Sequence, residues 1–192
     1  MARKKDFKPD KPRSGWLSKL YITPKQRRAI LKWVLYSLVV LVLSLLQDVV
    51  LCNFRLFGAA TEQVPCAIIL ICQLEGTQNG SVFALAASGF YLFSGSAPGP
   101  HVLVLITVLA VVLSALRQTY LHPRFPAMLL CVAFAMVLYE LTIFGFCMLL
   151  GQVTAVRFNA FLVAAITSLI SVPVVYPIAK IIGRIGGEAW KE

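Results

Sequence analysis

The residues that could carry out chemistry are few, and most lie inside or beside long apolar runs. Glu140 is the deepest acid, at the fifteenth position of the run 126–151. A buried carboxylate costs about 2.5–3.5 kcal/mol on membrane-insertion scales, so it must face protein, be protonated or meet a partner. It could act as an ion or proton relay. Because no other run offers a basic partner, we favour a structural hydrogen bond between packed helices, with partner binding as the next choice.

Three further polar or glycine features are candidates for partner binding or for structure. Gln47 and Asp48 lie near the end of the first apolar run, where they can reach the interface or cap a neighbouring helix. Glu75 begins the segment EGTQNG (75–80), where we expect a solvated loop acid. Gly76 and Gly80 form a GxxxG pattern at this turn, where glycine supplies permissive backbone geometry.

Catalytic and metal-binding patterns are missing from the sequence. The five cysteines contain no CxxC, the two histidines lie near none of them, and zinc ligands normally come in closely spaced pairs. We also find no GxSxG, HExxH, phosphate-binding loop or paired carboxylates. We therefore expect no enzyme, no metal site and no cofactor.

The composition indicates a protein that lives in lipid. Of the 192 residues, 59% are apolar and 14% are charged, and the mean hydropathy is +0.81. Soluble domains contain roughly 45–50% apolar and about 25% charged residues. These values exclude an ordinary soluble domain, a disordered chain and a disulfide scaffold.

We predict an all-α polytopic membrane protein with about six transmembrane helices, two of them short. Lipid-exposed segments must satisfy their own backbone hydrogen bonds, which favours helices. The two short runs could instead form a hairpin that does not fully traverse, which leaves four spans. Pro126 suits the first turn of a helix, and Pro173 and Pro177 should kink the last one. The predicted helices cover residues 29–52, 64–74, 81–93, 101–116, 126–151 and 159–182.

The charges predict both the domain organisation and the topology. Residues 1–28 hold ten Lys or Arg against two Asp, and we interpret them as a cytoplasmic tail that contacts anionic lipid rather than nucleic acid. Residues 29–192 form a single helical membrane domain. With both termini inside and six crossings, sixteen of the eighteen Lys and Arg lie inside. Only Arg55 and Arg157 lie outside, which fits the positive-inside rule.

The order of these features resembles the MreD family of the bacterial rod-shape (elongation) system, over roughly residues 30–185. The first run ends in LLQDVVL (45–51), which contains the Leu-Gln pair common in the family. Pro65 then opens a short apolar run. EGTQNGSVFALAASGF (75–90) resembles the family's glycine-containing turn followed by a helix that contains a glycine, here Gly89. SGSAPGPHVLVL (94–105) and YEL (139–141) also fit.

The resemblance implies a non-enzymatic scaffold in the bacterial plasma membrane, with its helices arranged like an S component of energy-coupling-factor transporters. It would bind an MreC-like single-span protein and, with MreB, RodA and a penicillin-binding transpeptidase, would organise lateral peptidoglycan synthesis. We expect the partner's helix to dock in a groove of small residues at the short helices.

Two other functions stay open from the sequence. A vitamin-binding S component would need a polar pocket near the exterior face, but the first run lacks an A-x-x-x-A docking face and the loops are sparse in ligand-binding groups. A secondary transporter could use Glu140 as a proton relay, but the chain has no second inverted repeat of the kind many transporters show.

Overall fold

The computed structural model describes residues 24–51, 61–120 and 125–185, and all its regular elements are helices. The all-α prediction is therefore confirmed. The helices are α1 (Pro24–Val49), α2 (Gln63–Glu75), α3 (Thr77–Phe93), α4 (His101–Tyr120), α5 (Phe125–Leu149), α6 (Phe158–Ser168) and α7 (Val172–Ile185). Short 3₁₀ turns, η3 (Ala155–Arg157) and η4 (Leu169–Ser171), precede α6 and α7.

Four helical stretches in the described residues are long and apolar enough to cross a membrane, so the chain is a polytopic membrane protein. They are Gln26–Val49, His101–Thr119, Phe125–Leu149 and Ala155–Ile185. α2 has 13 residues. It therefore rises only about 20 Å, less than the hydrocarbon core of about 30 Å. The count of six crossings stays a prediction.

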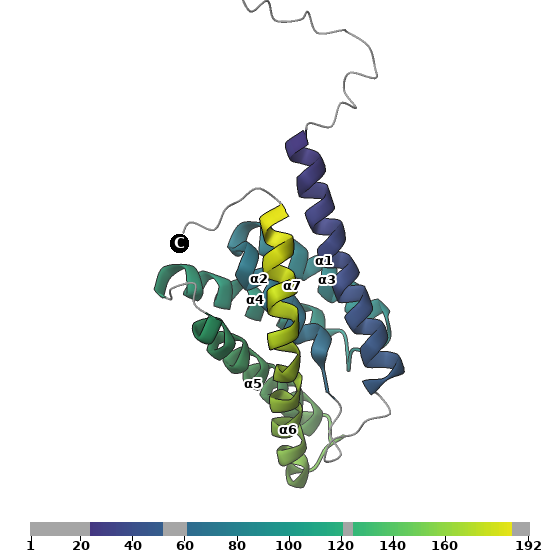
Figure 1. Cartoon of the computed structure of the whole chain (residues 1–192). Helices are drawn as coiled ribbons and strands as arrows, with labels where there is room; N and C mark the ends of the chain where they lie inside the picture. The colour runs from purple at the N-terminus through teal and green to yellow at the C-terminus, as the bar shows by residue number, and fades with distance from the viewer. Residues whose placement is uncertain (1–23, 52–60, 121–124, 186–192) are drawn as a thin grey trace, which may run out of the picture.

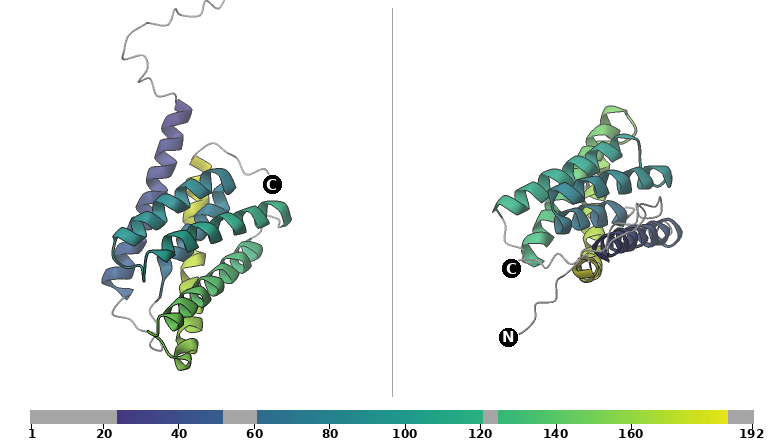
Figure 2. Two further views of the ribbon diagram at one scale, coloured as in Figure 1. Left: turned by 180° about the vertical axis from the view of Figure 1, so that it is seen from behind. Right: turned by 90° about the horizontal axis from the view of Figure 1, so that it is seen from above.

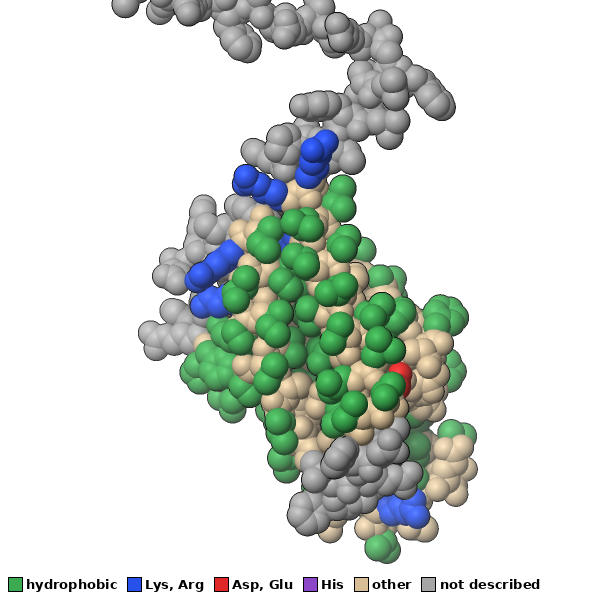
Figure 3. All heavy atoms as spheres, turned by 45° about the vertical axis from the view of Figure 1, so that its right-hand side comes forward, with side chains coloured by type: hydrophobic (Ala, Val, Ile, Leu, Met, Phe, Trp, Pro, Cys, Tyr) green, Lys and Arg blue, Asp and Glu red, His purple; other side chains and the backbone are tan. Residues whose placement is uncertain are grey.

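The helices surround α2. Seen from above, α3 and α4 lie on one side of α2, and α1 and α7 lie on the other (Figure 2). α2 contacts α1, α3, α4, α5 and α7. α1 begins and α7 ends at the same end of the bundle (Figure 1). On the face seen in Figure 3, apolar side chains cover most of the surface. Lys and Arg side chains gather toward the end where α1 begins, and a smaller basic patch lies at the opposite end.

α2 is buried on all sides because it has no polar face. Its residues from Val64 to Leu74 are all buried, and Gln73 is the one polar side chain among them. α1 differs, since one side of it exposes large apolar residues such as Val34, Leu38 and Leu45. A helix that is apolar all round belongs in the core, and exposed apolar stripes on outer helices suit contact with lipid.

The helix bounds agree with the predicted runs to within a few residues, apart from the first and the last. α1 begins at Pro24 rather than at residue 29, so the end of the predicted tail 1–28 is helical, and residues 1–23 lie outside the described residues. Pro126 occupies the first turn of α5 as predicted. The last run is broken at η4, immediately before Pro173, where a proline ring excludes the preceding helical turn.

The turn between α2 and α3 depends on two glycines. Gly76 has φ +85°, a left-handed conformation that terminates α2 and begins α3, as its predicted role requires. Gly80 lies inside α3 rather than in the turn. A Cβ there would stand 2.7 Å from both the carbonyl oxygen and the Sγ of Cys72, so only glycine lets α3 approach α2 so closely.

We predict that Gly80→Ala lowers stability, because the Cys72 backbone would have to move; overpacking typically costs about 1–3 kcal/mol. Unfolding by a titrated denaturing detergent would measure it. Gly145→Ala is the control, since no atom lies within 4 Å of the added methyl group. Equal stability of the two variants would contradict the close approach.

Candidate functional site

Polar side chains meet the buried amino end of α2. The first backbone N–H groups of a helix have no partner within the helix. Here Gln47 Oε1 accepts from the N–H groups of Gln63 and Val64, at 2.9 and 3.1 Å. The N–H of Glu62 donates to Ser168 Oγ at 2.9 Å. Gln47 therefore caps a neighbouring helix, one of the two roles that its position predicts.

A cluster of five side chains continues from this cap, and we call it the amino-end cluster: Gln47, Glu62, Tyr91, Tyr139 and Glu140. Tyr139 donates to Glu62 Oε2 at 2.5 Å, and Tyr91 lies 3.5 Å from the same oxygen. Gln47 Nε2 donates to the Tyr91 hydroxyl at 3.3 Å. Burial raises the pKa of Glu62, against the hydrogen bonds of the two tyrosines, which lower it.

Glu140 is the member of this cluster with an unmatched acceptor. It is 3% exposed, and its Oε1 has no hydrogen-bond partner among the described residues. Its charge interacts with that of Glu62 and with the hydroxyls of Tyr91 and Tyr139. The interhelical hydrogen bond that we favoured for Glu140 is therefore not made by Oε1.

The opposite end of α2 carries the carboxyl-end cluster, Lys32, Tyr36 and Glu75. The Lys32 ammonium lies 2.5 Å from Glu75 Oε2, and the Tyr36 hydroxyl donates to Glu75 Oε1 at 2.6 Å. The same hydroxyl lies 3.1 Å from the backbone carbonyl of Ala179 in α7. The Arg117 guanidinium also donates to the backbone carbonyl of Gln73, which belongs to the last turn of α2.

One sequence interpretation is wrong at this end. Glu75 is not a solvated loop acid, because its side chain is 3% exposed and pairs with Lys32. The Lys32 side chain is also buried, at 6% exposed. A charge removed from water needs a partner, and each of these residues supplies the other's.

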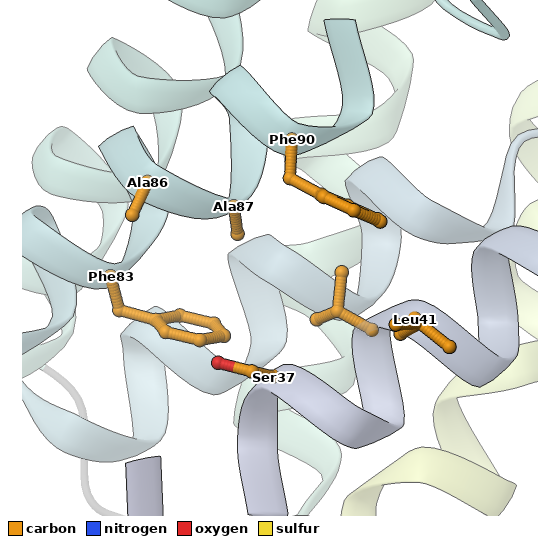
Figure 4. Close-up of a pocket in the computed structure, with 7 residues that line it drawn as sticks. Ser37, Leu41, Phe83, Ala86, Ala87 and Phe90 are labelled. Atoms are coloured by element: carbon orange, nitrogen blue, oxygen red, sulfur yellow. The ribbon is translucent and has the colours of Figure 1, made fainter. Parts of the chain in front are cut away.

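A groove of ≈ 190 Å³ lies between α1 and α3 (Figure 4). Ser37, Ala86 and Ala87 are its small residues. Its larger walls are Val40, Leu41, Phe83 and Phe90. The rings of Phe83 and Phe90 stand on either side of Ala87 in the close-up. The lining is apolar except for the Ser37 hydroxyl, so the groove suits an apolar occupant.

The structure divides the predicted site residues between the two ends of α2. Asp48 is exposed at the rim of the amino end, where it accepts from the Ser96 hydroxyl at 2.5 Å. Pro65 is buried in the first turn of α2. Gly89 has only ordinary contact with Leu103, so packing does not require glycine there. Gln47, Asp48, Pro65 and Glu140 belong to the amino end, and Glu75, Gly76 and Gly80 belong to the carboxyl end.

Sequence reasoning missed Glu62, Tyr91, Tyr139, Lys32 and Tyr36. Glu62 lies in a mixed stretch between two apolar runs, where nothing distinguishes it from a loop acid. The sequence did contain a signal, because an acid lies beside each end of the short apolar run 64–74: Glu62 before it and Glu75 after it. A buried helix needs polar partners at both its ends, so these residues could have been assigned to them.

We predict that Lys32→Met destabilises the fold, because it leaves the Glu75 carboxylate buried without its cation, a loss typically of about 3–5 kcal/mol. The double variant Lys32→Met/Glu75→Leu should regain most of this loss, as a double-mutant cycle by detergent denaturation would show. Lys180→Met serves as the control, since Lys180 is only half-buried. Additive losses in the double variant would contradict the pairing.

Comparison with known proteins identifies no relative of this chain. No family model, no curated protein and no solved structure matches it. The resemblance to the MreD family therefore stays a prediction from the sequence, and the two clusters and the groove are the observations available for assigning a function.

Proposed function

We propose that this protein is a non-enzymatic membrane scaffold of the MreD type, which binds a single-span partner like MreC and organises lateral peptidoglycan synthesis. MreB, RodA and a penicillin-binding transpeptidase would be its further partners, and the basic tail would contact anionic lipid. The observation that carries the proposal is the groove between α1 and α3.

The groove supports docking of one transmembrane helix. Helices associate in lipid by close packing at small residues, because apolar burial alone does not drive them together. Ser37 and Ala86 are exposed and give a partner's backbone room to approach. Phe90, which is 45% exposed, provides a wall that the partner's side chains can pack against. The groove is lined by only one of the two short helices, α3, and its other wall is the long helix α1, so the proposed docking position differs from the one expected at the two short helices.

We predict that Ser37→Phe and Ala86→Phe, which fill the groove from opposite sides, abolish co-purification of the single-span partner from native membranes. Both positions are exposed, so the fold should persist. Val174→Phe is the matched control, because it enlarges an exposed residue on α7, outside the groove. Recovery of the chain without any partner from wild-type membranes would contradict the scaffold, and undiminished recovery with both groove variants would contradict the docking site.

We assign the protein to the bacterial plasma membrane, with both termini in the cytoplasm. Two observations support this orientation. α1 begins and α7 ends at one end of the bundle, and Lys and Arg side chains gather where α1 begins (Figures 1 and 3). Basic residues near span ends favour the cytoplasmic side.

We predict that reporters fused to either terminus are active only if they function in the cytoplasm. A phosphatase that requires export should be inactive at both positions, and a fluorescent protein that folds in the cytoplasm should be bright. An active phosphatase at either end would reverse the orientation. Fusion of the phosphatase within residues 151–157, between α5 and α6, is the internal control and should be active.

A vitamin-binding S component is the second candidate, and the amino-end cluster favours it. The unmatched Oε1 of Glu140 and the buried, unmatched Oγ1 of Thr61 could receive donors from a ligand. A vitamin that binds at this end should raise the melting temperature of the purified protein, whereas a scaffold should not respond to any vitamin.

A further inference from the structure

The two ends of α2 differ in their balance of charge. At the carboxyl end, the Glu75 carboxylate faces the Lys32 ammonium. At the amino end, Glu62 accepts from Tyr139, the residue directly before Glu140 in α5, so both acids belong to one cluster. No basic side chain among the described residues pairs with either acid. Two ionised carboxylates close together in a poorly solvated site repel each other strongly. The amino-end cluster therefore lacks a positive charge.

The cluster contains oxygen atoms that could coordinate a cation. Among the described residues, neither the buried Glu140 Oε1 nor the buried Thr61 Oγ1 has a hydrogen-bond partner. The hydroxyls of Tyr139 and Tyr91 lie 2.5 and 3.5 Å from Glu62 Oε2. Carboxylate and hydroxyl oxygens are ligands that hard cations prefer. No group of three or more His, Cys, Asp or Glu side chains suited to a metal ion gathers in the described part of the chain, which argues against a multivalent ion.

We infer that the amino-end cluster is a binding site for one monovalent cation, either Na⁺ or a proton, held between Glu62 and Glu140. One positive charge reduces the net charge of the pair to that of a single carboxylate, which Tyr91 and Tyr139 can stabilise by donating hydrogen bonds. The site lies apart from the groove between α1 and α3, so its occupancy goes beyond the scaffold function and does not depend on it.

Other ionisable groups lie near the pair on the neighbouring elements. Asp48, at the end of α1, interacts electrostatically with Tyr91. His101 of α4 stacks on Phe146, six residues further along α5 than Glu140. None of these groups makes an ion pair with Glu62 or Glu140. The ionisable residues on the elements that surround the cluster are the following: Asp48 in α1, Glu62 directly before α2, Cys66 in α2, Tyr91 in α3, His101 in α4, Tyr139 in α5 and Arg157 before α6.

The test is the thermal stability of the full-length protein in detergent. One series raises sodium chloride at fixed pH and constant ionic strength, with choline chloride as the replacement salt. A second series lowers the pH without sodium. We expect the melting temperature to rise in at least one series. A rise with sodium identifies Na⁺, and a rise only with acid identifies the proton, because a carboxyl group that gains a proton on folding loses its stabilisation as the pH rises.

Variants tie the response to the site. Glu140→Gln removes the charge that calls for a cation, so it should melt at a higher temperature than wild type without sodium at high pH, and it should lose the response. Gln78→Ala is the control, since Gln78 is exposed in the first turn of α3, at the opposite end of α2, and it should keep the wild-type response. Tyr139→Phe retains both carboxylates but removes a hydrogen bond that orients Glu62. It should weaken the apparent affinity for the cation about tenfold, as loss of an orienting hydrogen bond typically does. This variant replaces Glu140→Gln in the test if Glu140→Gln does not fold. The inference is overturned if wild type responds in neither series, or if the variant at Glu140, or Tyr139→Phe in its place, responds as wild type does.

Discussion

The constraint on which the structure depends is that α2 is buried on every side, from Val64 to Leu74. Every helix leaves unpaired N–H groups at one end and unpaired carbonyls at the other. Inside a membrane these groups cannot form hydrogen bonds with water. The neighbouring helices therefore bring polar side chains to both ends of α2: Gln47 and Ser168 to the first, and Arg117 to the second. The two buried clusters are consequences of this need.

The positions of the helices could be predicted because the first and last residues of each apolar run can be read directly from the sequence. The turn at Gly76 and the break before Pro173 follow from the local backbone chemistry of glycine and proline, which acts within a few residues. Such features require no knowledge of neighbours. α1 extends beyond its apolar run because a helix end with charged residues can continue into the headgroup region, where water satisfies it.

The polar partners could not be predicted, because they join residues far apart in the sequence. Lys32 and Glu75 are 43 residues apart, and Tyr139 and Glu62 are 77 apart. α2 has no polar face, so its sequence does not indicate which side of it packs against which neighbouring helix. The residue pairs in these contacts therefore could not be predicted. Hydropathy places Glu140 in a membrane run, but it does not show that Glu62, from a connecting segment, hydrogen-bonds Tyr139, the residue directly before Glu140.

Within the described residues, the two clusters differ in whether their buried charge is balanced. The carboxyl-end cluster is complete within the described residues, because Lys32 and Tyr36 occupy both oxygens of Glu75. Both acceptors of this carboxylate are therefore already matched by donors of the chain itself. Among the described residues, the amino-end cluster has two acids, no paired base and a buried oxygen without a donor. Since a buried charge without compensation is costly, the cation that we propose would relieve this imbalance.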